Sequence, residues 1–156
     1  MGLKITSATD YAIRAMIHLA CVPEDSQTLR DHVATAEDIP SSFMAKILRS
    51  LVRARLLRSS RGVNGGFALA RPAEEITLLQ IVEAIEGPIH LTACCGPVDS
   101  CSRSSLCPAA GVWVDVQVQM EKVLGAATLE GLVSTPRRNG RIDRQPMLKV
   151  VGIPAS

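Results

Sequence analysis

Four of the five cysteines in the 156-residue chain fall within fourteen positions. Cys95, Cys101 and Cys107 are each separated by five residues, Cys94 offers an alternative first position, and Cys21 stands alone. Zinc sites usually use cysteine pairs separated by about two to four residues, whereas thiolates hold iron–sulfur clusters at varied spacings. The pattern therefore predicts an iron–sulfur cluster bound by Cys95, Cys101 and Cys107, with Cys94 as the alternative to Cys95.

The residues around these cysteines are mostly Gly, Pro, Ser and Asp, which are typical of a loop that wraps around a ligand. Asp10, Arg14 and His18 interrupt the first apolar stretch, so it does not resemble a signal peptide, and no apolar run reaches the ~18 residues of a membrane span. We therefore expect a soluble, cytoplasmic protein in which clustered cysteines serve metal or redox chemistry. His90 is a further candidate for a fourth ligand.

Positive charge is concentrated in one part of the chain, although the net charge is only +2. Residues 39–73 contain seven Lys and Arg side chains and no acidic residue. Such a stripe predicts contact with a polyanion. Aromatic residues make up only 3% of the chain, which argues against stacking on single-stranded nucleic acid.

Two helices are predicted before this stripe. The first runs from about Ser7 to Cys21, and Ser7 and Asp10 have the spacing of a capping box. A short second helix begins at Thr28, with Asp31 as its capping partner.

A third helix begins at Ser41 or Ser42 and reaches about Ala54. Its apolar ridge, at helical spacings of three and four, consists of Met44, Ile47, Leu48 and Leu51. Its opposite face is polar and cationic and consists of Ser42, Lys46, Arg49 and Arg53. A short helix, a tight turn and a helix with a cationic face are typical of a helix-turn-helix.

Two short strands are predicted next, over residues 56–60 and 67–70. Asn64-Gly65 between them supplies the positive backbone dihedrals of a hairpin turn. A hairpin after a helix-turn-helix is a wing, in which Arg58 and Arg61 are placed to reach phosphates or a minor groove. A nucleotide P-loop is excluded, because no Gly-Lys-Ser/Thr follows and the next element is a strand.

The second half of the chain is predicted to be helical around the cysteine segment. Thr77 and Gln80 form a capping box for a fourth helix, which Gly87 ends. After the cysteines, apolar residues at alternating spacings of three and four predict a long helix that packs against another helix. This seam consists of Trp113, Val116, Met120, Val123 and Ala127. The alternating valines over 112–118 also fit a strand, but the length of the segment favours a helix.

Several motifs occur together in chain order. Thr9-Asp10-Tyr11-Ala12-Ile13-Arg14 lies in the first helix, Arg61-Gly62-x-x-Gly65-Gly66-Phe67 in the hairpin, and Glu83-Ala84-Ile85-Glu86-Gly87-Pro88 before the cysteines. From about residue 3 to residue 133 the chain resembles the IscR/NsrR/RirA family of iron–sulfur winged-helix transcription regulators.

The resemblance implies a homodimer that clasps through its C-terminal helix, reads a dyad operator in double-stranded DNA and changes its DNA affinity with the state of its cluster. It places Ser42, Lys46 and Arg49 on the recognition helix and Arg61 and Asn64 on the wing.

Two departures from the family pattern bear on specificity and on the cluster. Some members carry an acidic residue on the recognition helix where this chain has Ala45, and the IscR branch has a histidine where this chain has Ala110. The NsrR branch resembles the chain through Asp10, which in that branch completes a 4Fe–4S cluster from the partner subunit. A 4Fe–4S cluster is therefore favoured over 2Fe–2S, while a capping role for Asp10 stays open.

The fold class that follows is mainly α with a small β-hairpin wing. We expect a winged helix-turn-helix domain over 1–87, a cluster-binding loop over 88–108, a dimerisation helix over 109–135 and a flexible basic tail over 136–156.

The expected function is a transcription regulator, a repressor that senses nitric oxide, redox or iron–sulfur status. No catalytic triad or paired carboxylates occur, so we do not expect an enzyme. The alternatives are a metal-free thiol-based regulator of the same fold, a cluster-containing electron-transfer protein and a zinc-stabilised interaction module.

Overall fold

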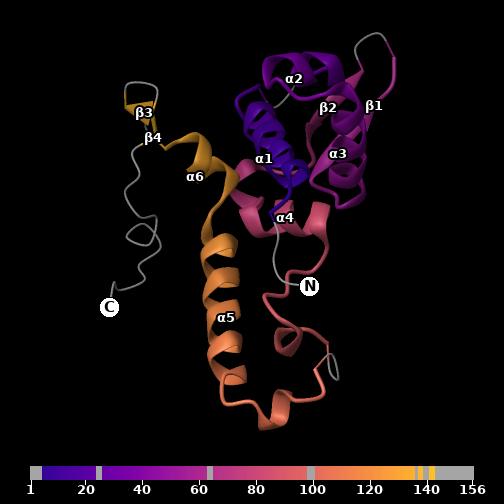
Figure 1. Ribbon diagram of the computed structural model, residues 1–156. Coiled ribbons are helices and arrows are strands. Elements are labelled where there is room, and N and C mark those ends of the chain that lie inside the picture. Colours follow the sequence, from indigo (N-terminus) through magenta and orange to yellow (C-terminus); the bar gives the residue numbers. More distant parts are fainter. Residues whose placement is uncertain are drawn as a thin grey trace.

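The computed structural model describes residues 5–23, 26–62, 65–97, 101–135, 137–138 and 141–142. In chain order the elements, with η for a short 3-10 helix, are α1 (Ser7–Ala20), α2 (Arg30–Ala36), α3 (Ser41–Arg53), β1 (Leu57–Ser60), β2 (Gly66–Leu69), η1 (Ala73–Glu75), α4 (Leu78–Glu86), η2 (Ala93–Cys95), η3 (Ser104–Leu106), α5 (Ala110–Ala126), α6 (Leu129–Val133), β3 (Arg137–Arg138) and β4 (Arg141–Ile142). The helices α1 to α4 gather beside the β1–β2 hairpin, and α5 extends away from them next to the cysteine segment (Figure 1). None of the helices in the described ranges is long and apolar enough to cross a membrane.

The core is aliphatic and is shared by four helices. Met16 of α1, Met44 and Leu51 of α3, Ile81 of α4 and Leu129 of α6 have no exposed surface. All of them belong to one cluster of buried side chains, so α6 returns the chain to the helix-turn-helix after α5.

The start of α1 differs from the prediction. Thr6, rather than Ser7, is the N-cap, and its hydroxyl oxygen accepts a hydrogen bond from the backbone N–H of Thr9. The Glu86 carboxylate fixes this position, because it accepts hydrogen bonds from the N–H (3.2 Å) and the hydroxyl (2.7 Å) of Thr6. The predicted capping box of Ser7 and Asp10 is therefore wrong.

The second helix begins at Arg30, two residues after the predicted start. Thr28 exchanges two backbone hydrogen bonds with Phe67, at 3.0 and 2.9 Å, and so extends the sheet instead of capping the helix. The Asp31 carboxylate binds Nε of Arg30 at 2.8 Å, and this hydrogen bond lowers the pKa of Asp31.

The third helix and the hairpin follow the prediction closely. The four ridge residues of α3 are buried, although Pro40 rather than a serine occupies the N-cap position. Strands β1 and β2 pair antiparallel, with Leu57 opposite Leu69 and Ser60 opposite Gly66. A helix-turn-helix followed by a wing is therefore present.

Gly66 is required by a close approach between β2 and the segment before α2. A Cβ atom at this position would lie 2.7 Å from the carbonyl oxygen of Thr28. We expect Gly66→Ala to lower the free energy of unfolding by about 1–3 kcal/mol, because backbone atoms must move to accept the methyl group. Urea unfolding at fixed protein concentration measures the change.

The matched control is Gly111→Ala in α5, where an added Cβ meets no atom within 4 Å. This variant should be as stable as the wild type or more stable by about 0.5–1 kcal/mol. Equal urea midpoints for Gly66→Ala and the wild type would contradict the pairing of Thr28 with Phe67.

The fourth helix has the predicted capping box of Thr77 and Gln80, and it ends at Gly87, whose φ is 81°. The segment over 112–118 is helical, so the strand alternative is wrong. The predicted single helix over 109–135 is interrupted at residues 127–128. It breaks because the carbonyl of Ala127 accepts a hydrogen bond from the N–H of Leu78 and because Thr128 caps α6.

Part of the basic tail lies within the described ranges. Arg137 pairs with Ile142 and Arg138 with Arg141 in a short antiparallel ladder. The rest of the predicted flexible tail lies outside the described residues.

Candidate nucleic-acid interface and cysteine loop

The face of α3 opposite the core is exposed and cationic. Ser42, Lys46, Arg49 and Arg53 are all exposed, and the first turn of α3 contains no acidic residue. The Nε of Arg49 donates to the carbonyl oxygen of Ala45 at 3.1 Å. Because this bond lies along the helix surface, the Arg49 guanidinium stays at the solvent-facing side of α3.

The wing adds two more cations beside α3. Arg58 on β1 and Arg61 at the start of the turn are exposed, and the hairpin lies next to α3 (Figure 1). Asn64, the other predicted wing contact, lies outside the described residues. Six of the seven residues predicted to contact DNA are therefore exposed, and their contact with DNA stays a prediction.

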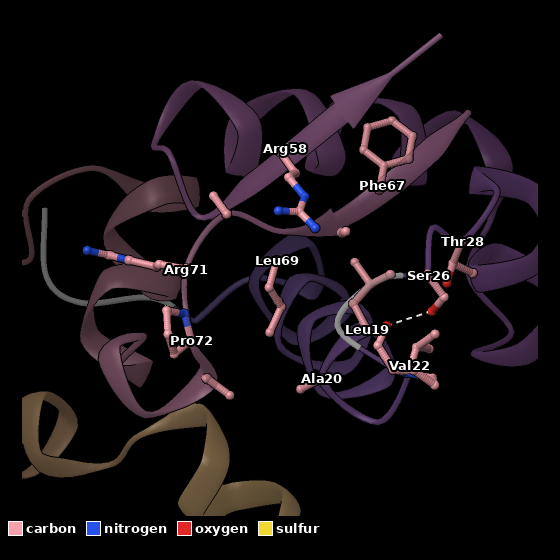
Figure 2. A pocket seen from close by; sticks show the side chains of 14 residues that line it. Leu19, Ala20, Val22, Ser26, Thr28, Arg58, Phe67, Leu69, Arg71 and Pro72 are labelled. Atoms are coloured by element: carbon pink, nitrogen blue, oxygen red, sulfur yellow. Dashed lines mark hydrogen bonds between the residues drawn. The ribbon is translucent and has the colours of Figure 1, made fainter. Parts of the chain in front are cut away.

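A cavity of about 300 Å³ lies between the end of α1 and β2. Its lining is mainly apolar and includes Leu19, Val22 and Leu69, and the Arg58 guanidinium extends over it (Figure 2). Among the described residues, its lining contains no histidine, cysteine or carboxylate.

Two aromatic residues at this surface were missed by the sequence analysis. Phe43, in the first turn of α3, is 46% exposed. Its ring packs edge-to-face on Tyr11 of α1, with centroids 5.9 Å apart and planes at 78°. The sequence did contain a sign of Phe43, because it is an aromatic residue of the third helix that lies outside the apolar ridge.

Ion pairs connect α1 to the turn between α2 and α3. A carboxylate oxygen of Glu37 lies 3.0 Å from Nδ1 of His18, and the other lies 3.7 Å from Nε of Arg14. Arg14 also lies 3.7 Å from the Asp10 carboxylate and over the ring of Tyr11. These contacts hold the helix-turn-helix on α1.

The cysteine loop, residues 88–108, connects α4 to α5. Cys94, Cys95, Cys101 and Cys107 all carry free thiols. The hydroxyl oxygen of Thr92 lies 2.9 Å from the sulfur of Cys94 and 3.5 Å from that of Cys95. The sulfurs of Cys94 and Cys95 therefore contact the same hydroxyl group.

Within the described ranges, no three His, Cys, Asp or Glu side chains are arranged to hold a metal ion. The loop therefore brings Cys94 and Cys95 together but does not gather the predicted triad of Cys95, Cys101 and Cys107. The chemistry of the donor set still fits an iron–sulfur cluster, because several free thiols lie on one loop.

The two candidates for a fourth ligand lie in different surroundings. The Asp10 side chain is 62% exposed and accessible from outside the chain. His90 has a buried Nδ1 for which no hydrogen-bond partner is found in the described residues.

Helix α5 carries the cysteine loop on one side, and several of its other side chains are exposed. Gln117 is buried and binds the loop through the N–H of Leu91 (2.9 Å) and the carbonyl of Ile89 (2.7 Å). The exposed large apolar residues of α5 are Val112, Trp113, Val114, Val116 and Val118. The sequence indicated the apolar seam but gave no sign of the contacts of Gln117.

The Rrf2 family of iron-dependent transcriptional regulators matches residues 5–135 of the chain. The chain belongs to the Rrf2 family. A helix-turn-helix-type transcriptional regulator of Mycobacterium tuberculosis (strain H37Rv) is 33% identical over 127 residues, which span 81% of this chain and 79% of that protein.

Two solved Rrf2-like structures have the same winged-helix fold. CymR, the global cysteine regulator of B. subtilis, is 25% identical with a TM-score of 0.70, covering 86% of this chain and 98% of that one. IscR of T. potens is 25% identical with a TM-score of 0.67, covering 85% of this chain and 88% of that one. This Rrf2 protein is thus a DNA-binding transcription regulator and not an enzyme, which also argues against the electron-transfer alternative.

Proposed function

We propose that this Rrf2 protein is a homodimeric repressor of a dyad operator whose DNA affinity is set by an iron–sulfur cluster on the cysteine loop. The observation that carries the proposal is an acid-free cationic face on α3, beside a wing and connected through α4 to a loop with four free thiols. The cluster reports nitric oxide, redox or iron–sulfur status.

The DNA contacts are assigned by position. The outer face of α3 enters the major groove, where Lys46 and Arg49 contact DNA, and Ser42 and Arg53 flank them. Arg58, Arg61 and Asn64 belong to the wing and reach phosphates or the minor groove.

The partner surface is the exposed part of α5. A helix that is apolar around much of its circumference and exposed to water is unstable alone, and a second copy of the same helix covers it. Two copies would place two wings and two recognition helices on one duplex. This arrangement matches a dyad operator with half-sites about one helical turn (~34 Å) apart.

The proposed cluster is held by three thiolates and by a fourth ligand that exchanges more easily than a thiolate. Cys95, Cys101 and Cys107 are the assigned ligands, with Asp10 of the partner subunit as the fourth; Cys94 and His90 are the alternatives. The exposure of Asp10 supports this assignment, as does the capping of α1 by Thr6 rather than by the predicted box of Ser7 and Asp10. When bound, a 4Fe–4S cluster (or, as the alternative, 2Fe–2S) supplies redox-sensitive iron at which a small molecule can bind.

A change at the cluster can reach the DNA-binding surface through the contacts of α1. Its start is held by Glu86 at the end of α4, and its surface holds the turn before α3 through Glu37. Release of a ligand at the start of α1 therefore reaches the recognition helix through groups that are already in contact.

A metal-free thiol regulator is the second candidate function. It is favoured by the common contact of Cys94 and Cys95 with Thr92 and by the likeness to CymR, a cysteine regulator. Iron and sulfide analysis after anaerobic purification separates the two functions. A zinc-containing, colourless protein would favour the zinc-stabilised module instead.

Salt-dependent binding tests the proposed interface. For Lys46→Ala and Arg61→Ala, each lost phosphate contact should lower the salt slope of operator binding by about one unit, whereas a lost base contact should reduce specificity by about 1–3 kcal/mol. Binding isotherms at several salt concentrations, with operator and random duplexes, measure both quantities.

Arg103→Ala is the matched control, because Arg103 is an exposed arginine on the cysteine loop, away from α3 and the wing. It should keep the wild-type slope. If Lys46→Ala and Arg61→Ala bind both duplexes like the wild type, α3 and the wing are not the DNA-binding surface.

A further inference from the structure

Phe43 is an exposed aromatic residue at the start of α3, the helix whose outer face is polar and cationic. It lies in the first turn of α3, next to Ser42, and 46% of it is exposed. The four apolar residues that anchor α3 in the core are fully buried without it. Phe43 is therefore not part of the buried core cluster.

The ring of Phe43 is held in place rather than free in solvent. Its edge-to-face contact with Tyr11 has a centroid distance of 5.9 Å, and Tyr11 itself packs against the core. Edge-to-face packing is a preferred arrangement for aromatic pairs. The structure thus presents a fixed hydrocarbon surface at the start of the recognition helix.

Only one group on the major-groove edges of the four bases suits such a surface. The C5-methyl group of thymine is apolar, whereas every other distinguishing feature is a hydrogen-bond donor or acceptor that phenylalanine cannot satisfy. The first residues of a recognition helix are those that contact base edges in this class of protein.

We infer that Phe43 is a specificity-determining residue that recognises the C5-methyl group of a thymine in each operator half-site. The inference rests on the proposed function, because it needs α3 to enter the major groove. It adds an apolar base contact to the cationic outer face of α3.

Replacement of thymine by uracil tests this contact, because the two bases differ only in the methyl group. The probe is an operator selected from random duplexes by the full-length wild-type protein, with each half-site thymine changed in turn to uracil. Wild-type affinity should fall about fourfold at one position per half-site, which is the effect of one buried methyl or methylene group. Phe43→Ala should bind thymine and uracil equally, with an unchanged salt slope.

Leu29→Ala is the matched control. Leu29 is also an exposed apolar residue of the helix-turn-helix, 60% exposed, but it occupies the N-cap position of α2 rather than lying on α3. This variant should keep the preference for thymine. Cytosine and 5-methylcytosine at the same position provide a second comparison: a gain for 5-methylcytosine that depends on Phe43 supports methyl recognition.

The outcomes separate the inference from the proposed function. A selected operator without an invariant thymine, or a thymine preference that survives in Phe43→Ala, overturns the role of Phe43 while operator binding stands. Failure to select any operator overturns the proposed function and the inference together. A thermal melt of Phe43→Ala like that of the wild type shows that the variant is folded.

Discussion

Cys101→Ala is expected to abolish iron and sulfide binding. Cys101 is the central cysteine of the triad, and no other cysteine lies within five positions of it on either side. Without Cys101 the loop keeps Cys107 and the adjacent Cys94 and Cys95, and we expect two adjacent cysteines not to replace a thiolate from the middle of the loop around one cluster. Visible absorption and iron and sulfide analysis after anaerobic reconstitution measure the loss.

Three further variants make this prediction sharper. Only one of Cys94→Ala and Cys95→Ala should lose the cluster, and the spacing favours Cys95. Asp10→Ala should keep iron with an altered spectrum and an altered response to nitric oxide. Cys21→Ala removes an exposed thiol at the end of α1 and is the matched control.

Two results would contradict the assignment. Wild-type iron content in Cys101→Ala would show that Cys101 is not a ligand and that the assigned triad is wrong. An unchanged spectrum and nitric-oxide response in Asp10→Ala would show that Asp10 is not a ligand, and the connection across the dimer would then be wrong.

Val116→Asp in α5 is expected to produce a monomer that binds the operator at least about a hundredfold more weakly. Val116 is 45% exposed, so the change costs little within one subunit but places a charge in the proposed seam. A monomer binds only one half-site and so loses the increase in affinity that comes from bivalent binding, which is a factor of about 10²–10⁴. Sedimentation and operator isotherms measure the two effects.

The matched control for Val116→Asp is Lys122→Asp. It also places an aspartate on α5, but at an exposed position that is already charged and lies outside the seam. It should remain dimeric. A dimeric Val116→Asp protein with wild-type operator affinity would contradict an interface formed by α5.

The elements that could be predicted from the sequence depend on neighbours along the chain. The ridge and outer face of α3 follow from helical periodicity, and the capping box of α4 needs only Thr77 and Gln80. The hairpin follows from two short apolar runs around a glycine-rich turn. These patterns also led to the proposed DNA-contacting residues, of which the six in the described part of the chain are exposed.

The elements that were predicted incorrectly depend on partners far away in the sequence. Thr6 replaces Ser7 as the cap because Glu86 accepts its hydrogen bonds. Thr28 does not start α2, as was predicted, because its backbone pairs with the backbone of Phe67. The long C-terminal helix breaks because the carbonyl of Ala127 binds the N–H of Leu78.

The candidate site shows the same division. The cysteine spacing indicated a ligand set. The arrangement of the thiols, however, depends on Thr92 and on Gln117 of α5, and no repeating pattern in the sequence indicates their contacts. The exposure of Phe43 depends on the three-dimensional packing of α1 against α3.

In the proposed function, one dimer both carries the iron–sulfur cluster and binds the operator. Native mass spectrometry of the wild-type protein, purified anaerobically and mixed with an operator duplex before and after cluster removal, tests it most directly. We expect a dimer with one cluster per chain and a change in the bound fraction of duplex when the cluster is removed. A dimer that carries no iron and sulfide, or one whose duplex binding is the same with and without the cluster, would contradict the claim.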